Sequence, residues 1–122
     1  MTRKQPLHLR QGRDTEDRAY QHLSSHGLKL LERNYRAPCG EIDLIMEQRD
    51  TLVFVEVRYR RSETFGTPAE TINARKQAKL RATAAHYLQQ HRSARKQPCR
   101  FDIVAVSGAR DGERVLWLQN AF

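Results

Sequence analysis

Two apolar segments joined by a short polar turn constrain the fold of this chain most strongly. Residues 40–47 (GEIDLIME) and 52–58 (LVFVEVR) are rich in branched apolar side chains, and residues 48–51 (QRDT) separate them. Apolar runs of this length, bounded by polar turn residues, are typical of β-strands. The sequence therefore predicts an antiparallel hairpin in which Glu47 lies opposite Leu52 and Ile45 lies opposite Phe54.

Both strands of the hairpin carry carboxylates inside the apolar run. The same register puts Asp43 opposite Glu56 and Glu41 opposite Arg58, whereas a shift of one residue would send the first two to opposite faces. Directly opposed side chains lie roughly 5 Å apart at Cβ, where like charges are destabilising. Such a pair either retains a proton or binds a cation. Asp43 and Glu56, with a main-chain carbonyl and waters, are thus expected to form a hard-metal site of the Mg²⁺ type.

The composition favours one soluble domain with a polyanionic partner. The chain has 122 residues, and its 22 Lys and Arg residues outnumber 14 Asp and Glu to give a net charge of +8. This surplus favours nucleic acid as the partner over an anionic membrane surface. No apolar run approaches the roughly 20 residues that span a bilayer, and the N-terminus lacks the apolar core of a signal peptide. We therefore expect a cytoplasmic protein with no membrane partner.

The cysteines and histidines follow no metal-binding or disulfide pattern. Cys39 and Cys99 lie far apart in the sequence, without the spacing of a zinc site or of a disulfide framework. The five histidines are scattered, so a zinc enzyme is not indicated.

The order of predicted elements is α-β-β-β-α-β-β. Residues 1–11 are expected to form a basic flexible tail and residues 12–122 a single domain. Helix one is predicted from about Asp14 to Ser25, and helix two from a capping box that begins at Thr67 to about Gln90. Strands are predicted at 28–36, in the hairpin, at 101–106 and at 115–118. Helix two is long enough to connect parallel strands, so we expect a central mixed sheet flanked by helices.

Glu16 shares the inward-facing stripe of helix one with Ala19, Tyr20 and Leu23. Two interpretations remain open for this acid. It is either a first-turn glutamate favoured by the helix dipole, or a third carboxylate directed at the acidic hairpin.

An acid on a helix, an aspartate on one strand and Glu-x-basic on the next together resemble the PD-(D/E)xK nuclease superfamily. The positions here are Glu16, Asp43 and 56–58 (EVR). The chain also resembles the bacterial YraN family over nearly its whole length. The matching positions are Gly12, Glu16, Ala19, Gly27, 34–36 (NYR), 40–45 (GEIDLI), 54–57 (FVEV), Gly66, Lys76, 100–102 (RFD) and 120–122 (NAF).

The resemblance implies a restriction-endonuclease-like α/β fold, similar to that of archaeal Holliday-junction resolvases, and a nuclease whose cellular substrate is undefined. It implies that Asp43 and Glu56 bind Mg²⁺ or Mn²⁺ and that Glu16 is an accessory acid. Glu41 lies in the matched GEIDLI segment, but its predicted pairing with Arg58 favours a salt bridge over a role in the reaction.

The chain departs from the nuclease pattern at Arg58, where a lysine is usual. Arginine stays protonated, so Arg58 is unable to take a proton from water, although it can stabilise charge on a phosphate. A lysine of helix two, Lys76 first and Lys79 second, is one substitute for the missing group. Activation of water by the metal alone is the other.

Three functions follow from these observations. The first is a metal-dependent nuclease acting on structured or branched nucleic acid, with DNA favoured over RNA, in which Arg58 and Lys76 balance developing charge. A two-fold dimer would suit symmetric cutting. Phosphate contacts are expected from Arg60, Arg61, Arg75, Lys79, Arg95 and Lys96.

The second function is a nucleic-acid-binding protein that keeps the nuclease fold without turnover, which the presence of Arg58 favours. The third is a structural or protein-interaction domain, in which Asp43 and Glu56 only form salt bridges, for example with Arg100 or Arg58.

Overall fold

The computed structural model describes residues 7–60, 72–108 and 114–122. Their order confirms the predicted α/β fold class, with helices on a mixed sheet. The elements are α1 (Leu7–Ser25), β1 (Lys29–Ala37), β2 (Gly40–Gln48), β3 (Thr51–Arg60), α2 (Ala74–Gln90), the short 3-10 helix η2 (Arg92–Lys96), β4 (Cys99–Ser107) and β5 (Arg114–Leu118).

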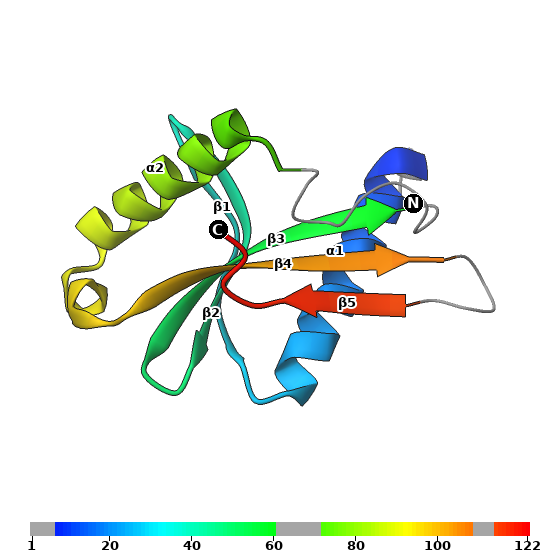
Figure 1. Ribbon diagram of the computed structural model, residues 1–122, viewed down its shortest axis with the longest axis horizontal. Coiled ribbons are helices and arrows are strands. Elements are labelled where there is room, and N and C mark those ends of the chain that lie inside the picture. Colours follow the sequence, from blue (N-terminus) through cyan, green and yellow to red (C-terminus); the bar gives the residue numbers. More distant parts are fainter. Residues whose placement is uncertain (1–6, 61–71, 109–113) are drawn as a thin grey trace, which may run out of the picture.

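The five strands form one sheet in the order β1-β2-β3-β4-β5. Strands β3 and β4 are parallel, and the other neighbouring pairs are antiparallel. Since α2 lies between β3 and β4 in the chain, it makes the predicted crossover connection. Figure 1 shows α2 over one face of the sheet and α1 behind the opposite face.

Each face of the sheet has its own hydrophobic cluster. The cluster under α2 includes Phe54, Leu80 and Ile103, and the cluster under α1 includes Leu23 and Val55. Phe54 and Val55 are neighbours in β3, so their side chains point to opposite faces and both are buried. Burial on both faces is typical of a central strand and explains the nearly continuous apolar run of β3.

The predicted register of the hairpin is confirmed in its closed part. Glu47 pairs with Leu52 and Ile45 with Phe54, and the turn contains Arg49 at φ 55°. The hydrogen-bonded ladder between β2 and β3 ends at Leu44 and Val55, immediately before the two acids. Strand β2 continues beyond this point with β1 as its partner.

The predicted pairing of Glu41 with Arg58 is wrong. Glu41 lies opposite Arg36 of β1, and its Oε2 is 3.4 Å from Arg36 Nε. The physical reason is that β2 pairs with β1, not β3, at this end of the strand. The salt-bridge role that we expected for Glu41 therefore has a different partner.

Both helices begin elsewhere than the sequence predicts. Helix α1 begins at Leu7, so part of the expected tail is helical. Helix α2 begins at Ala74, because Asn73 is extended and its side chain accepts a hydrogen bond from Lys76 N at 2.8 Å. The capping box that begins at Thr67 lies outside the described residues, and a helix continuous from there is wrong. No helix in the described part of the chain is long and apolar enough to cross a membrane.

Gly40 allows α2 to approach the turn between β1 and β2. A Cβ atom at Gly40 would lie 2.9 Å from the side-chain oxygen of Thr83 and 3.7 Å from the carbonyl oxygen of Lys79. The Thr83 hydroxyl is itself held by a 2.8 Å hydrogen bond to that carbonyl. This close contact fixes the distance between α2, which carries Lys76 and Lys79, and the strand that carries Asp43.

Candidate active site

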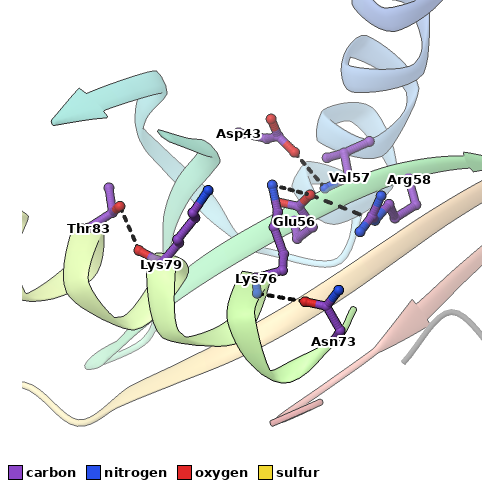
Figure 2. Close-up of polar contacts among 8 residues, drawn as sticks. All are labelled: Asp43, Glu56, Val57, Arg58, Asn73, Lys76, Lys79 and Thr83. Atoms are coloured by element: carbon purple, nitrogen blue, oxygen red, sulfur yellow. Dashed lines mark hydrogen bonds and ion pairs between the residues drawn. The ribbon is translucent and has the colours of Figure 1, made fainter. Parts of the chain in front are cut away.

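Asp43 lies where the ladder between β2 and β3 has ended. Its Oδ2 accepts a hydrogen bond from the main-chain N–H of Val57 at 2.8 Å, as Figure 2 shows. The side chain thus satisfies a donor of β3 that no longer has a ladder partner from β2. This bond holds the carboxylate of Asp43 beside β3, next to Glu56.

Glu56 is almost fully buried, with 8% of its side chain exposed, and its charge faces two cations. Lys76 Nζ lies 3.5 Å from Glu56 Oε1, and Arg58 Nε lies 3.8 Å from the same oxygen. Figure 2 shows the side chain of Lys76 extending from α2 toward the carboxylate of Glu56. The structure therefore brings together four of the predicted catalytic residues, Asp43, Glu56, Arg58 and Lys76.

Both carboxylates of the pair are costly to ionise. Burial, followed by the negative charge of Asp43, raises the pKa of Glu56 to about 7, against the opposing effect of Lys76 and Arg58. Burial also raises the pKa of Asp43, although the hydrogen bond from Val57 N–H works in the other direction. A pair of this kind is stabilised either by a shared proton or by a cation between the carboxylates.

Glu16 belongs to the same electrostatic group. Burial, followed by the charge of Asp43, raises the pKa of Glu16. Because α1 begins at Leu7, Glu16 is not in the first turn, and the helix-dipole interpretation is wrong. Arg33 of β1 approaches Glu16 at 3.8 Å and contacts Asp17 at 2.7 Å. Glu16 therefore faces the acidic hairpin while Arg33 holds it from the other side.

Two arginines near the site were not anticipated from the sequence. Arg33 and Arg36 neutralise acids that flank the carboxylate pair, and both lie on β1. The pairing of Arg36 with Glu41 depends on the register between β1 and β2, which a bulge near Leu31 shifts. The contact of Arg33 with Glu16 depends instead on how α1 packs against β1. The pairing of Arg100 with Asp43 or Glu56 is wrong, since Arg100 Nε instead donates to Asp102 Oδ1 at 3.0 Å.

The predicted phosphate contacts fall into two groups. Arg60 ends β3, and Arg75 and Lys79 lie on the first turns of α2, the helix that carries Lys76. Arg95 and Lys96 lie in η2, beyond the far end of α2. At about 1.5 Å per residue, that end of the helix is roughly 20 Å along the helix axis from Lys76. Arg61 lies outside the described residues. The first group therefore lies on β3 and α2, the elements that carry Arg58 and Lys76.

The donor set suits a hard divalent cation with few protein ligands. The described residues contain no group of three or more His, Cys, Asp and Glu side chains arranged to hold a metal ion. Mg²⁺ commonly uses only one or two carboxylates and takes its other ligands from water and substrate phosphate. Asp43 and Glu56 fit this pattern, because each offers oxygen ligands and burial raises the pKa of each carboxylate.

Known proteins resemble this chain at two levels. A solved structure of Pyrococcus furiosus SfsA in complex with Ca²⁺ matches with 13% identity and a TM-score of 0.36. The match covers 89% of this chain and 62% of that one, so the chain spans less than two thirds of the length of SfsA.

Curated relatives are much closer. A UPF0102 protein of Nitrosococcus oceani is 45% identical over 98% of this chain and 96% of its own length. One from Nitrosomonas europaea is 51% identical over 91% of this chain and 92% of its own. The model of the uncharacterised protein family UPF0102 matches residues 15–106, which include every described acid of the site. The chain therefore belongs to this family, which is also called the YraN family.

Proposed function

We propose that the chain is a cytoplasmic, metal-dependent nuclease that hydrolyses phosphodiester bonds in structured or branched nucleic acid, with DNA favoured over RNA. The observation that carries this proposal is the placement of Asp43 beside Glu56, with Lys76 Nζ 3.5 Å from the Glu56 carboxylate. The net charge of +8 and the resemblance to PD-(D/E)xK nucleases support a polyanionic substrate.

Asp43 and Glu56 are the ligands for Mg²⁺ or Mn²⁺ in this proposal. The bound ion would polarise the scissile phosphate and lower the pKa of a bound water. Asp43 is prepared for this role by its hydrogen bond to Val57 N–H, which fixes the orientation of the carboxylate. Glu16 is the accessory acid, and its contact with Arg33 keeps it oriented.

Lys76 replaces the lysine that the nuclease pattern usually places at position 58. It comes from α2, but its ammonium group reaches the same carboxylate that Arg58 contacts. Arg58 stays protonated and donates to phosphate oxygens, whereas Lys76 is able to bind the phosphate or to exchange a proton with water. Arg58 and Lys76 together thus supply the phosphate contact and the proton exchange that a single lysine supplies in the usual pattern.

The neighbouring cations bind flanking phosphates. Arg60 follows Arg58 on β3, Arg75 and Lys79 lie on α2 with Lys76, and Arg95 and Lys96 lie in η2. Arg61, the next residue in the sequence after Arg60, is expected to contribute as well. Binding that depends on several phosphate contacts weakens steeply as salt is added. A two-fold dimer would place two such sites on two strands.

A non-catalytic nucleic-acid-binding protein is the second candidate. Lys76 and Arg58 both approach Glu56, so the protein itself supplies two positive charges where a metal ion would otherwise act. In that case the carboxylates would fix the arginine and lysine for phosphate binding, and no turnover would occur.

Asp43→Asn separates the two candidates. It retains an oxygen for Val57 N–H but removes the charge, and Asp50→Asn makes the same change in the exposed turn of the same hairpin. Cleavage of branched DNA and of RNA is measured with Mg²⁺ or Mn²⁺. A nuclease loses cleavage with Asp43→Asn, retains binding, and is unaffected by Asp50→Asn. Tight binding without cleavage by the unmodified protein would instead support the binding module.

A further inference from the structure

Two histidines lie side by side at the end of α1, on a part of the molecule that the nuclease proposal does not use. His22 is in the last turn of α1 and His26 follows the helix directly. Residues four apart share one face of a helix. Their ring centroids are 4.5 Å apart and the ring planes are tilted by 37°.

The hydrogen bonds of His26 determine which of its nitrogens is available. Its Nδ1 lies 2.7 Å from the carbonyl oxygen of His22 and 3.2 Å from the Ser25 hydroxyl, which itself donates to that carbonyl. A carbonyl only accepts, so Nδ1 carries the hydrogen and Nε2 has a free lone pair in the neutral ring. Histidines that bind metals usually have this arrangement, with the other ring N–H donated to a carbonyl or carboxylate.

The surroundings keep both rings in place and favour the neutral form of His22. Burial, followed by the charge of His26, lowers the pKa of His22. The indole of Trp117 packs edge-on against both rings, with centroids 6.2 and 5.6 Å away. Trp117 is fixed in turn, since its Nε1 donates to the buried Asp102 at 2.8 Å.

We propose that His22 and His26 chelate one borderline divalent transition metal of the Zn²⁺, Ni²⁺ or Cu²⁺ class. Imidazole nitrogens suit these ions, whereas Mg²⁺ prefers oxygen. Two nitrogens that bind one ion at about 2.0 Å lie within about 4 Å of each other. Ring centroids 4.5 Å apart allow one nitrogen of each ring to come that close. His26 is exposed and His22 is half-buried, so water would complete the coordination of the ion at this site, which is distinct from Asp43 and Glu56.

The single tryptophan of the chain makes this site directly observable. Trp117 contacts both rings, so Ni²⁺ or Cu²⁺ bound there is expected to quench its fluorescence, and Zn²⁺ is expected to compete and restore it. The titration uses the full, untagged chain. As a second measurement, Zn²⁺ should raise the melting temperature, because a ligand that binds only the folded state stabilises it.

His91 provides a matched control. Its Nδ1 lies 2.9 Å from the carbonyl oxygen of Tyr87, four residues earlier, but the ring that stacks on it belongs to Tyr87 and not to a histidine. His22→Gln and His26→Gln should each weaken Ni²⁺ binding at least about 10-fold, the lower end of the loss seen even for residues that only support a ligand. His91→Gln and Asp43→Asn should leave it unchanged. Equal affinity in the unmodified protein and both histidine variants, or loss with Asp43→Asn, would overturn the proposal.

Discussion

Lys76 Nζ lies 3.5 Å from Glu56 Oε1, although the lysine belongs to a helix and the glutamate to the middle of the sheet. Asn73 caps α2 three residues earlier, so the position of the first helical turn determines where the ammonium group lies. The start of α2 is therefore part of the site's geometry.

Replacing Lys76 tests whether it supplies the group that Arg58 does not. Lys76→Ala should lower the rate of cleavage by about 100-fold, the usual cost of losing one group that stabilises transition-state charge. Lys79→Ala removes an equal charge one helical turn away and should mainly weaken binding in low salt. Rates from saturating single-turnover assays separate the two effects. Equal rates for Lys76→Ala and the unmodified protein would show that Lys76 takes no part.

Glu56→Gln should stabilise the metal-free protein at alkaline pH. The pKa of Glu56 is raised from 4.5 to about 7, so the unfolded chain loses this proton first as the pH rises. The contribution of Glu56 to the free energy of unfolding therefore decreases as the pH rises from about 4.5 to 7. Above pH 7 the folded protein is destabilised by the full cost of ionising the buried Glu56, on the order of a few kcal/mol.

Urea unfolding in EDTA at pH 5 and pH 8 measures this effect. The stability gained on replacing Glu56 by Gln should be larger at pH 8 than at pH 5. Glu32→Gln, on β1, is the control and should show no such difference. A gain that is equal at both pH values would mean that Glu56 is not held in its neutral form by the fold.

The hairpin could be predicted because local pattern and register determine it. Two apolar runs joined by a short turn predicted Ile45 opposite Phe54, which the structure confirms. The hydrogen bond from Val57 N–H then holds Asp43 beside β3, one pair beyond the end of the ladder. The partner of Glu41 could not be predicted in this way. It depends on the ladder between β1 and β2, which contains a shift near Leu31 that no local signal marks.

The start of α2 illustrates a second limit. The sequence around Thr67 has a strong capping box, yet the described helix begins after Asn73. Asn73 is also a good cap residue, and its side chain accepts a hydrogen bond from Lys76 N. The approach of Thr83 to Gly40 is a contact of α2 with the sheet, which a local capping signal does not describe. The preference of residues for the cap position is therefore not enough to predict where α2 begins.

Gly40→Ala tests this contact. The added Cβ would lie 2.9 Å from the Thr83 hydroxyl oxygen, so the helix or the turn must move, at a cost of about 1–3 kcal/mol. Adding Thr83→Ala to the Gly40→Ala chain removes the hydroxyl oxygen that the new Cβ would approach too closely. The double variant should therefore recover part of the lost stability. A double-mutant cycle by thermal unfolding measures the coupling. Strictly additive effects would show that the two residues are not in contact.

Removing the carboxylate of Asp102 should lower the free energy of unfolding far more than removing a carboxylate from an exposed ion pair, even one with a shorter contact. It is fully buried and accepts hydrogen bonds from Arg100 Nε at 3.0 Å, Trp117 Nε1 at 2.8 Å and Asn120 N at 2.9 Å. Asp102→Ala leaves these donors without a partner and should cost about 3–5 kcal/mol.

Asp17→Ala is the comparison for Asp102. Its contact with Arg33 is only 2.7 Å long, but both side chains are substantially exposed, so the expected loss is about 1 kcal/mol or less. Denaturant unfolding of both variants measures the difference. Similar losses would contradict the prediction that burial, and not the length of the contact, decides how much each carboxylate contributes to stability.

Direct binding of Mn²⁺ tests the central claim, because it asks only whether Asp43 and Glu56 hold a divalent ion together. Calorimetric titration is carried out with the unmodified chain, with Asp43→Asn and Glu56→Gln, and with Asp50→Asn as the control. The account predicts one site that releases protons at pH 7, since the ion displaces the proton held through the raised pKa of Glu56. It predicts loss of that site in the first two variants and full retention in the control. Equal Mn²⁺ binding by all four proteins would contradict it.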